Sequence, residues 1–218
     1  MNEALFRLEG IEAGYGDGTA VLRGLDLEVQ RGDRLAITGP NGAGKSTLPH
    51  VMVGLIRPRT GSVWAFGRRR NGERAFHEVR LRAGLLFQQA DDQLFSPTVF
   101  DDVAFGPFNQ GKDATEVRDL VLATLDDLGL AGYEGRLTHM LSGGEKRLVS
   151  LATVLAMQPD VLLLDEPLAG LDQPTEARLV EILQRRPQAL VVVTHDPALV
   201  SALDLQRLEM RDGRLEPT

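Results

Sequence analysis

Cysteine is absent from all 218 residues. The chain therefore forms no disulfide and performs no thiol chemistry, which fits a reducing compartment. Long apolar runs are also missing, because the longest, such as 161–164 and 189–193, fall far below the ~20 residues that span a bilayer. The first ten residues carry three charged side chains and lack the apolar stretch of a signal peptide. We expect the chain to be soluble by itself, so that any membrane role comes through a partner.

Positive charge is the next feature in short supply. There are 24 Lys and Arg residues against 31 Asp and Glu, which gives a formal net charge of -7 and a pI of about 5.2. A general nucleic-acid binder normally has a basic face, and nothing in this sequence predicts one. A local basic cluster, Arg68–Arg70, stands beside the turn pair Asn71-Gly72. We expect this cluster to be a solvated tip.

Short apolar segments alternate with helical patterns in the last third of the chain. Residues 161–164 are entirely apolar, as in a strand that is buried on both faces. Residues 25–29 alternate apolar and polar side chains, as in a strand with one solvated face. Together they predict an α/β fold with a parallel sheet covered on both sides. The expected strands are 25–29, 35–37, 62–66, 85–87, 161–164 and 189–194, and Asp212-Gly213 predicts a closing hairpin turn.

The middle of the chain has helical periodicity. Apolar residues recur every three or four positions at Val117, Leu120, Val121, Leu125 and Leu128. A second helix is expected over about 142–157, and a proline at position 159 would end it. Its inward side chains are predicted to be Leu148, Leu151, Ala152 and Leu155. Two later helices are expected to begin at the capping residues Asp172 and Asp196.

A glycine-rich loop follows the expected strand 35–37. Its sequence fits G-x-x-x-x-G-K-[ST], and the residues are Gly39, Pro40, Asn41, Gly42, Ala43, Gly44, Lys45 and Ser46, with Thr47 following. In such a loop, backbone N–H groups turn inward around the phosphates of a nucleotide, and the next helix directs its positive end at them. Lys45 is expected to contact the β- and γ-phosphates, and Ser46 to bind Mg²⁺. Pro49 is compatible with this helix only if it falls in the first turn.

Two acids follow the apolar strand 161–164. Ligands bind where strands of a parallel sheet end, so Asp165 and Glu166 are expected in the same site as the loop. Asp165 would hold Mg²⁺, and Glu166 would polarise the attacking water. Phosphoryl transfer depends mainly on positioning and charge neutralisation, and one oriented base suffices.

The segment Leu141-Ser142-Gly143-Gly144-Glu145 resembles the signature motif of ATP-binding-cassette (ABC) ATPases. Ser142 and Glu145 also have the spacing of a capping box at a helix start. The resemblance implies that this helix end grips the γ-phosphate of an ATP held by a second copy.

Four further positions resemble elements of the same family. Tyr15 is similar to the aromatic residue that stacks on adenine, and Gln88 to the glutamine that reaches Mg²⁺ and the attacking water. Residues 169–172 resemble the loop that crosses the dimer interface, and His195 the histidine that contacts the γ-phosphate. One departure is Leu168, where many family members have threonine, and we expect activity to survive it.

The resemblance covers essentially the whole chain and implies a single ABC ATPase domain. Its P-loop NTPase (RecA-like) core, with an N-terminal antiparallel β-subdomain, is expected over about 1–87 and 156–218. An inserted α-helical subdomain is expected over about 88–155. The cofactors implied are ATP and Mg²⁺. Each ATPase site would need two chains, identical or related, and each would supply its phosphate loop to one site and its signature to the other.

Residues 88–111, QQADDQLFSPTVFDDVAFGPFNQG, are similar to the energy-coupling-factor group of importers, especially its cobalt and nickel branch. In that group this stretch meets a transmembrane coupling subunit, and a separate membrane subunit binds the substrate. Four phenylalanines in this stretch are expected to form an apolar groove for a partner helix or to fill the lobe's own core: Phe95, Phe100, Phe105 and Phe108. The implied location is the cytoplasmic face of the cell membrane.

Other functions remain open at this level. The chain has no cluster of His, Cys and carboxylates at ligand spacing, so a transported metal is expected to bind elsewhere. An importer of a vitamin or another micronutrient is the alternative. A soluble cassette such as an iron–sulfur assembly scaffold is opposed by the stretch 91–95. A DNA-repair cassette is opposed by the absence of a coiled-coil insertion, and a small-molecule kinase by the signature motif and His195.

Overall fold

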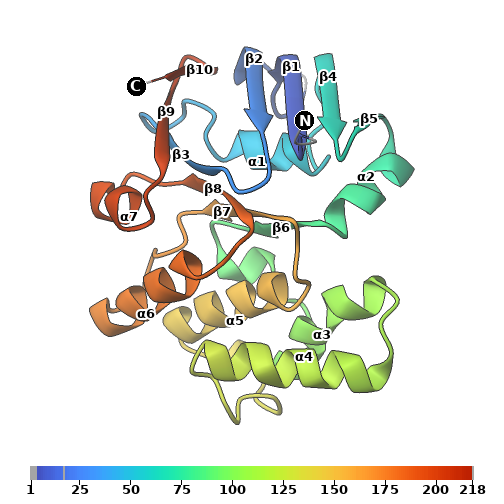
Figure 1. Cartoon of the computed structure of the whole chain (residues 1–218), viewed down its shortest axis with the longest axis vertical. Coiled ribbons are helices and arrows are strands. Elements are labelled where there is room, and N and C mark those ends of the chain that lie inside the picture. Colours follow the sequence, from blue (N-terminus) through green and yellow to red (C-terminus); the bar gives the residue numbers. More distant parts are fainter. Residues whose placement is uncertain (1–3, 17, 218) are drawn as a thin grey trace. The chain divides into compact units, whose positions relative to one another are not determined.

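The computed structural model describes residues 4–16 and 18–217 (Figure 1). The chain forms two compact units. The first unit contains residues 1–85, 160–166 and 187–218, and the second contains 86–159 and 167–186. Residues 167–186, which the sequence analysis placed with the nucleotide-binding core, thus cluster with the helical middle of the chain.

An antiparallel sheet forms the N-terminal part of the first unit. Its strands are β1 (Phe6–Ala13), β2 (Leu22–Val29), β4 (Thr60–Ala65) and β5 (Arg68–Arg70), in the order β2-β1-β4-β5 (Figure 1). Along β2, buried and exposed side chains alternate at its C-terminal end. The predicted antiparallel sheet is therefore present, with one face packed on the core.

The second sheet has the strand order β10-β9-β3-β8-β7-β6. All residues of β7 and β8 are buried, as predicted for strands covered on both faces. The pairings of β3 with β8 and β9 and of β7 with β8 are parallel, whereas β9 and β10 form the predicted hairpin. The bounds of its strands are β3 (Arg34–Thr38), β6 (Ala83–Leu86), β7 (Val161–Asp165), β8 (Ala189–Val193), β9 (Gln206–Arg211) and β10 (Arg214–Pro217).

Strand register sets the level at which the central strands end. Val193 of β8 pairs with Ile37 of β3 on one side and with Asp165 of β7 on the other. The three carboxyl ends therefore lie at one edge of the sheet, and the segments that follow them leave the sheet together.

Three short helices complete the first unit: α1 (Thr47–Met52), α2 (Glu73–Arg80) and α7 (Pro197–Ala202). Pro49 is the third residue of α1, within the first turn, where its missing N–H has no intrahelical acceptor. The predicted cap of α7 is also present, because Asp196 accepts a hydrogen bond from the Ala198 N–H at 2.8 Å.

The second unit is helical. Its helices α3, α4 and α5 pack on one another. Four predicted apolar residues of α4 and its end, Val117, Val121, Leu125 and Leu128, are buried, and Leu120 is half-buried. The elements of this unit are the 3-10 turns η1 (Ala90–Asp92) and η2 (Thr138–Met140) and the helices α3 (Val99–Asn109), α4 (Ala114–Asp127), α5 (Gly143–Leu155) and α6 (Gln173–Gln184).

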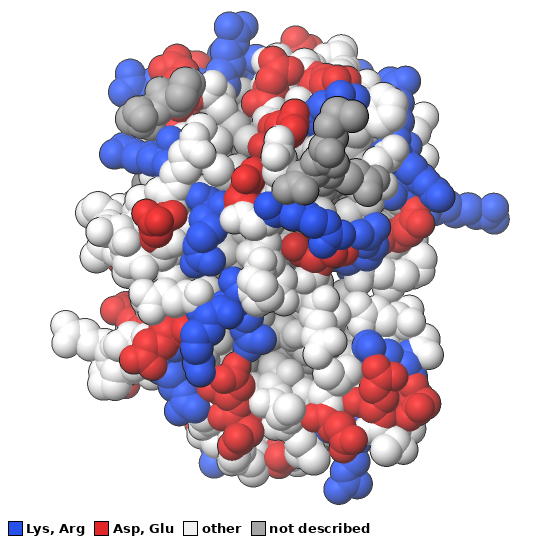
Figure 2. Space-filling model, in the orientation of Figure 1, with Lys and Arg blue, Asp and Glu red and all other residues white. Residues whose placement is uncertain are grey.

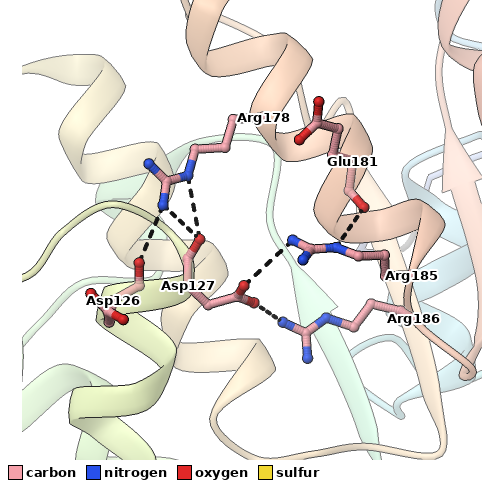
Figure 3. Close-up of polar contacts among 6 residues, drawn as sticks. All are labelled: Asp126, Asp127, Arg178, Glu181, Arg185 and Arg186. Carbon is pink, nitrogen blue, oxygen red and sulfur yellow. Dashed lines mark hydrogen bonds and ion pairs between the residues drawn. The ribbon is translucent and has the colours of Figure 1, made fainter.

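Arginines in α6 and at the two positions that follow it hold the C-terminal end of α4 (Figure 3). The Arg178 guanidinium donates to the carbonyls of Asp126 at 3.2 Å and of Asp127 at 3.0 Å. The Asp127 carboxylate pairs in turn with Arg185 and Arg186. These contacts satisfy carbonyls that a helix end leaves without an intrahelical donor.

Three local expectations need correction. Arg70 is 7% exposed and donates to the Ala65 carbonyl at 3.0 Å, so only Arg68 and Arg69 are solvated. The reason is tertiary packing, because the Arg70 guanidinium also donates to the Ala75 carbonyl at 3.3 Å and pairs with Glu78 of α2. The strand expected at 85–87 runs instead over 83–86, and Leu148 is only half-buried.

Two surface properties bear on possible partners. Within the described ranges, no helix is both long and apolar enough to cross a membrane. On the face shown in Figure 2, acidic side chains (red) and basic side chains (blue) are interspersed.

Burial of β7 predicts a large stability effect for Leu163→Ala. Leu163 is fully buried and pairs with Val191 of β8, so the truncation leaves a cavity that should cost about 2–5 kcal/mol. Leu55→Ala in the same unit, at a side chain that is 51% exposed, should cost less than about 1 kcal/mol. Urea unfolding of the two variants measures the difference, and equal losses would contradict the described core.

Candidate nucleotide-binding and catalytic site

The phosphate loop leaves the sheet directly after β3. Gly39 has a φ of 134°, and a Cβ atom there would lie 2.3 Å from the Met210 carbonyl oxygen. Gly44 has a φ of 106°, and its Cβ atom would lie 2.8 Å from the Leu22 side chain. Only glycine satisfies both the backbone conformation and the space at these two positions, so the loop's path depends on them.

Lys45 lies folded against its own loop. Its ammonium donates hydrogen bonds to the carbonyls of Gly39 and Pro40, both at 2.9 Å. The Thr47 N–H donates to the Gly44 carbonyl at 3.0 Å as α1 begins. A fixed positive charge thus lies beside the loop, where an anionic ligand is bound in this motif.

Asp165 and Glu166 follow at the end of β7. Asp165 is 3% exposed. Glu166 has a φ of 47°, which is rare for a residue with a side chain and is typical of functional sites. The Glu166 N–H donates to the Val193 carbonyl at 2.9 Å, which fixes this turn to the end of β8.

His195 faces Glu166 across the ends of the two strands. Its Nδ1 lies 2.8 Å from Glu166 Oε1. The hydrogen bond to Glu166 raises the pKa of His195 above its ordinary value of 6.5, and the negative charge of Glu166 adds to this effect. The geometry therefore joins a carboxylate, which can accept a hydrogen bond from a water molecule, and an imidazole, which can donate one to a phosphate.

Two hollows adjoin the phosphate loop. One, of about 590 Å³, is lined by residues 38–40, by His195 and the start of α7, and by β9. The other, of about 300 Å³, lies between residues 19–21, loop residues 40–43 and the hairpin turn at 212–213. Tyr15 is 58% exposed, as a side chain that stacks on a ligand must be.

The predicted site residues divide between the two units. The first unit holds Tyr15, the phosphate loop, Asp165, Glu166 and His195, and it brings the last two into contact. The second unit holds the exposed Gln88 and the signature segment. Within the described residues, no group of three or more His, Cys, Asp and Glu forms a metal-binding cluster.

The signature segment forms the predicted capping box. The Glu145 N–H donates to Ser142 Oγ at 3.3 Å, and the Ser142 N–H donates to Glu145 Oε2 at 2.8 Å. A Cβ atom at Gly144 would lie 3.7 Å from the Gly170 carbonyl, so the loop 169–172 runs beside the start of α5.

Residues 22–169 match the model of the ABC transporter family. The chain is an ABC ATPase. It is 49% identical to a putative ABC transporter ATP-binding protein of Brucella suis over 92% of the chain and 84% of that protein. It is 41% identical to the energy-coupling factor transporter ATP-binding protein EcfA of Methanothermobacter thermautotrophicus, over 97% of the chain and 69% of that protein.

A solved structure has the same fold. It is that of cbiO1 from Clostridium perfringens, described as part of the ABC transporter complex cbiONQ. The TM-score is 0.82 at 33% identity, with 98% of this chain and 87% of that chain covered. The likeness shows the expected ABC ATPase fold for this chain.

Arg147 of the ABC ATPase is a residue that the sequence analysis missed. It is 3% exposed and donates to the carbonyls of Phe87, of Gln88 at 3.2 Å and of Pro167 at 3.3 Å. The α5 helix thereby holds the segment of the predicted glutamine and the residue after Glu166. A signal was present, because Arg147 stands four residues before Leu151 on the inward face of α5.

The Glu166–His195 contact predicts the titration of the ABC ATPase's histidine. Below pH 6.5 the protonated imidazole pairs with Glu166 and stabilises the fold, and this contribution is lost as the pH rises through the higher folded-state pKa. NMR titration should therefore give His195 a midpoint above 6.5 in the wild type and a lower one in Glu166→Gln. Equal midpoints in the two proteins would exclude the contact.

Proposed function

We propose that this ABC ATPase powers a membrane importer of the energy-coupling-factor type, with cobalt or nickel ions as its cargo. In this proposal it lies at the cytoplasmic face of the membrane, bound to a second ATPase subunit, a transmembrane coupling subunit and a substrate-binding membrane subunit. The observation that carries the proposal is an exposed apolar groove beside α3, in the stretch 88–111. The EcfA and cbiO1 relatives support it.

The groove is built around two phenylalanines in edge-to-face contact. Phe95 is 68% exposed and Phe105 is 50% exposed, and their rings meet edge to face with centroids 4.9 Å apart. Together with Gly106 and Met157 they line a hollow of about 250 Å³. Exposed apolar side chains around a hollow are typical of a site that receives a partner's helix.

Asp102 gives the groove a polar anchor. Its side chain is 2% exposed and lines the hollow. Oδ1 accepts hydrogen bonds from the N–H groups of Phe95 at 3.1 Å and Ser96 at 2.9 Å. Oδ2 has no hydrogen-bond partner within the described residues. The two accepted hydrogen bonds fix the backbone of Phe95 and Ser96 beside the hollow.

Hydrolysis in this proposal needs two subunits. The phosphate loop of one subunit holds ATP, with Tyr15 stacked on adenine and Lys45 on the β- and γ-phosphates. The capped start of α5 from the other subunit, with Ser142, Gly143, Gly144 and Glu145, faces the γ-phosphate.

Within one subunit, Glu166 accepts a proton from the attacking water and orients it, and His195 donates to the γ-phosphate. Glu166 touches His195 through Oε1. This contact fixes the orientation of the imidazole beside the carboxylate.

The donor set suits Mg²⁺. Asp165 supplies a carboxylate at the end of β7 and Ser46 a hydroxyl at the start of α1, and both belong to the first unit. Mg²⁺ prefers such oxygen ligands and completes its shell with phosphate and water. Bound there, it would neutralise charge on the phosphates.

Glu166→Gln is predicted to preserve ATP binding and to lower kcat by about 10²–10⁴-fold, because the oriented base is lost. ATP should then hold the variant as a dimer. Nucleotide binding by fluorescence, phosphate release and light scattering measure the three properties. Turnover near the wild-type rate would exclude this role of Glu166.

The groove predicts a separate class of variant. Phe95→Ala and Phe105→Ala should reduce metal uptake by the reconstituted transporter at least about tenfold, because anchor side chains of this kind contribute ~2 kcal/mol or more. ATP hydrolysis by the isolated subunit should change little. Phe108→Ala is the matched control, since Phe108 lies on α3 with Phe105 and is 48% exposed but does not line the hollow. Equal uptake by all three variants would contradict the groove as the docking site.

A further inference from the structure

The start of α5, which carries the signature segment and is called the signature helix here, makes side-chain contacts beyond its capping box. One carboxylate oxygen of Glu145, Oε2, accepts from the Ser142 N–H at 2.8 Å within the box. The other, Oε1, accepts from the Tyr133 hydroxyl at 2.7 Å and from Arg136 Nη1 at 3.2 Å. These hydrogen bonds, first that of the Ser142 backbone and then that of Tyr133, lower the pKa of Glu145 to about 2.

Tyr133 and Arg136 form one rigid contact. The Arg136 guanidinium lies over the Tyr133 ring, 3.6 Å from its centroid. The Arg136 N–H also donates to the Tyr133 carbonyl at 2.9 Å, which closes a turn. Stacking and the turn fix the two donors in position, so Glu145 meets a preformed pair.

The same turn is hydrogen-bonded to the start of α3. The N–H groups of Val99 and Phe100 donate to the carbonyls of Arg136 and Glu134, both at 3.0 Å. Just beyond, the Thr138 hydroxyl donates to the Ser96 carbonyl at 2.7 Å. The start of α3 lies beside Phe95 of the groove, so segment 133–138 connects the groove to the signature helix within the second unit.

We propose that Tyr133 and Arg136 are positioning residues, which hold the start of α5 through Glu145 and fix it to the start of α3. The inference rests on the proposed function, because it gives Ser142 its place against the γ-phosphate held by a second subunit. Its physical basis is that a helix end held at Glu145 from two sides keeps its N–H groups in one direction.

Loss of these donors should loosen the start of α5 without touching the phosphate loop. Tyr133→Phe removes the hydroxyl and keeps the ring under Arg136. ATP binding to the single subunit should therefore stay at the wild-type level. ATP-driven dimerisation in the Glu166→Gln background should need about three- to tenfold more ATP. In the protein that keeps Glu166, the KM for ATP should rise more than kcat falls.

A double-mutant cycle tests whether Tyr133 acts through Glu145. In a Glu145→Ala background, Tyr133→Phe should add less than about twofold to the ATP requirement, because the carboxylate that accepts from the Tyr133 hydroxyl is already gone. Arg136→Lys should recover part of the effect of Arg136→Gln, since it restores a donor and a charge. Arg178→Gln is the control, because it also removes side-chain hydrogen bonds in the second unit but none that reaches the signature segment.

Three results would overturn the inference. The first is an unchanged ATP requirement in Tyr133→Phe and Arg136→Gln when the wild type dimerises and hydrolyses ATP. The second is the same shift in Arg178→Gln, and the third is fully additive effects in the cycle, since either of these would reduce the network to general stabilisation. A wild-type protein that neither dimerises with ATP nor hydrolyses it would instead contradict the proposed function.

Discussion

The parallel pairing of β3, β8 and β7 is the constraint on which the site depends. Ile37, Val193 and Asp165 lie at one level of the sheet. The phosphate loop, His195 and Glu166, which follow these three strands, therefore lie at the same edge. The strands themselves are apolar and buried, so hydrophobic burial fixes the register and the register then places the polar groups. The chemistry therefore needs no long-range polar network to assemble it within the first unit.

The second unit uses a different device. Its polar groups are held by hydrogen bonds, of which only the capping box at Ser142 is local; Arg147 bonds the Gln88 segment, and Tyr133 bonds Glu145. Each of these fixes the direction of a backbone segment rather than a reacting group. This suits a unit that, in the proposed function, presents a helix end to another subunit and a groove to a membrane partner.

Much of this arrangement was predictable from the sequence, for identifiable reasons. The phosphate loop, the buried strand before Asp165 and the capping box depend on local patterns, and the structure has the predicted strand, loop and cap at each. The burial of Arg70 and Arg147 was not predicted, because burial of an arginine depends on carbonyls supplied by other segments. The unpaired Asp102 oxygen and the Tyr133 contact also arise from packing between helices and loops, which periodicity does not reveal.

The central claim is that ATP is enclosed between the phosphate loop of one subunit and the signature segment of another. The absence of cysteine allows single spin labels at Met140→Cys, near Ser142, and at Thr19→Cys, beside the phosphate loop. The two labelled proteins, each in the Glu166→Gln background, can be mixed, and the distance between their labels measured by pulsed electron paramagnetic resonance. The account predicts one short intermolecular distance between the two labels that appears only with ATP. A distance distribution that ATP leaves unchanged would contradict it.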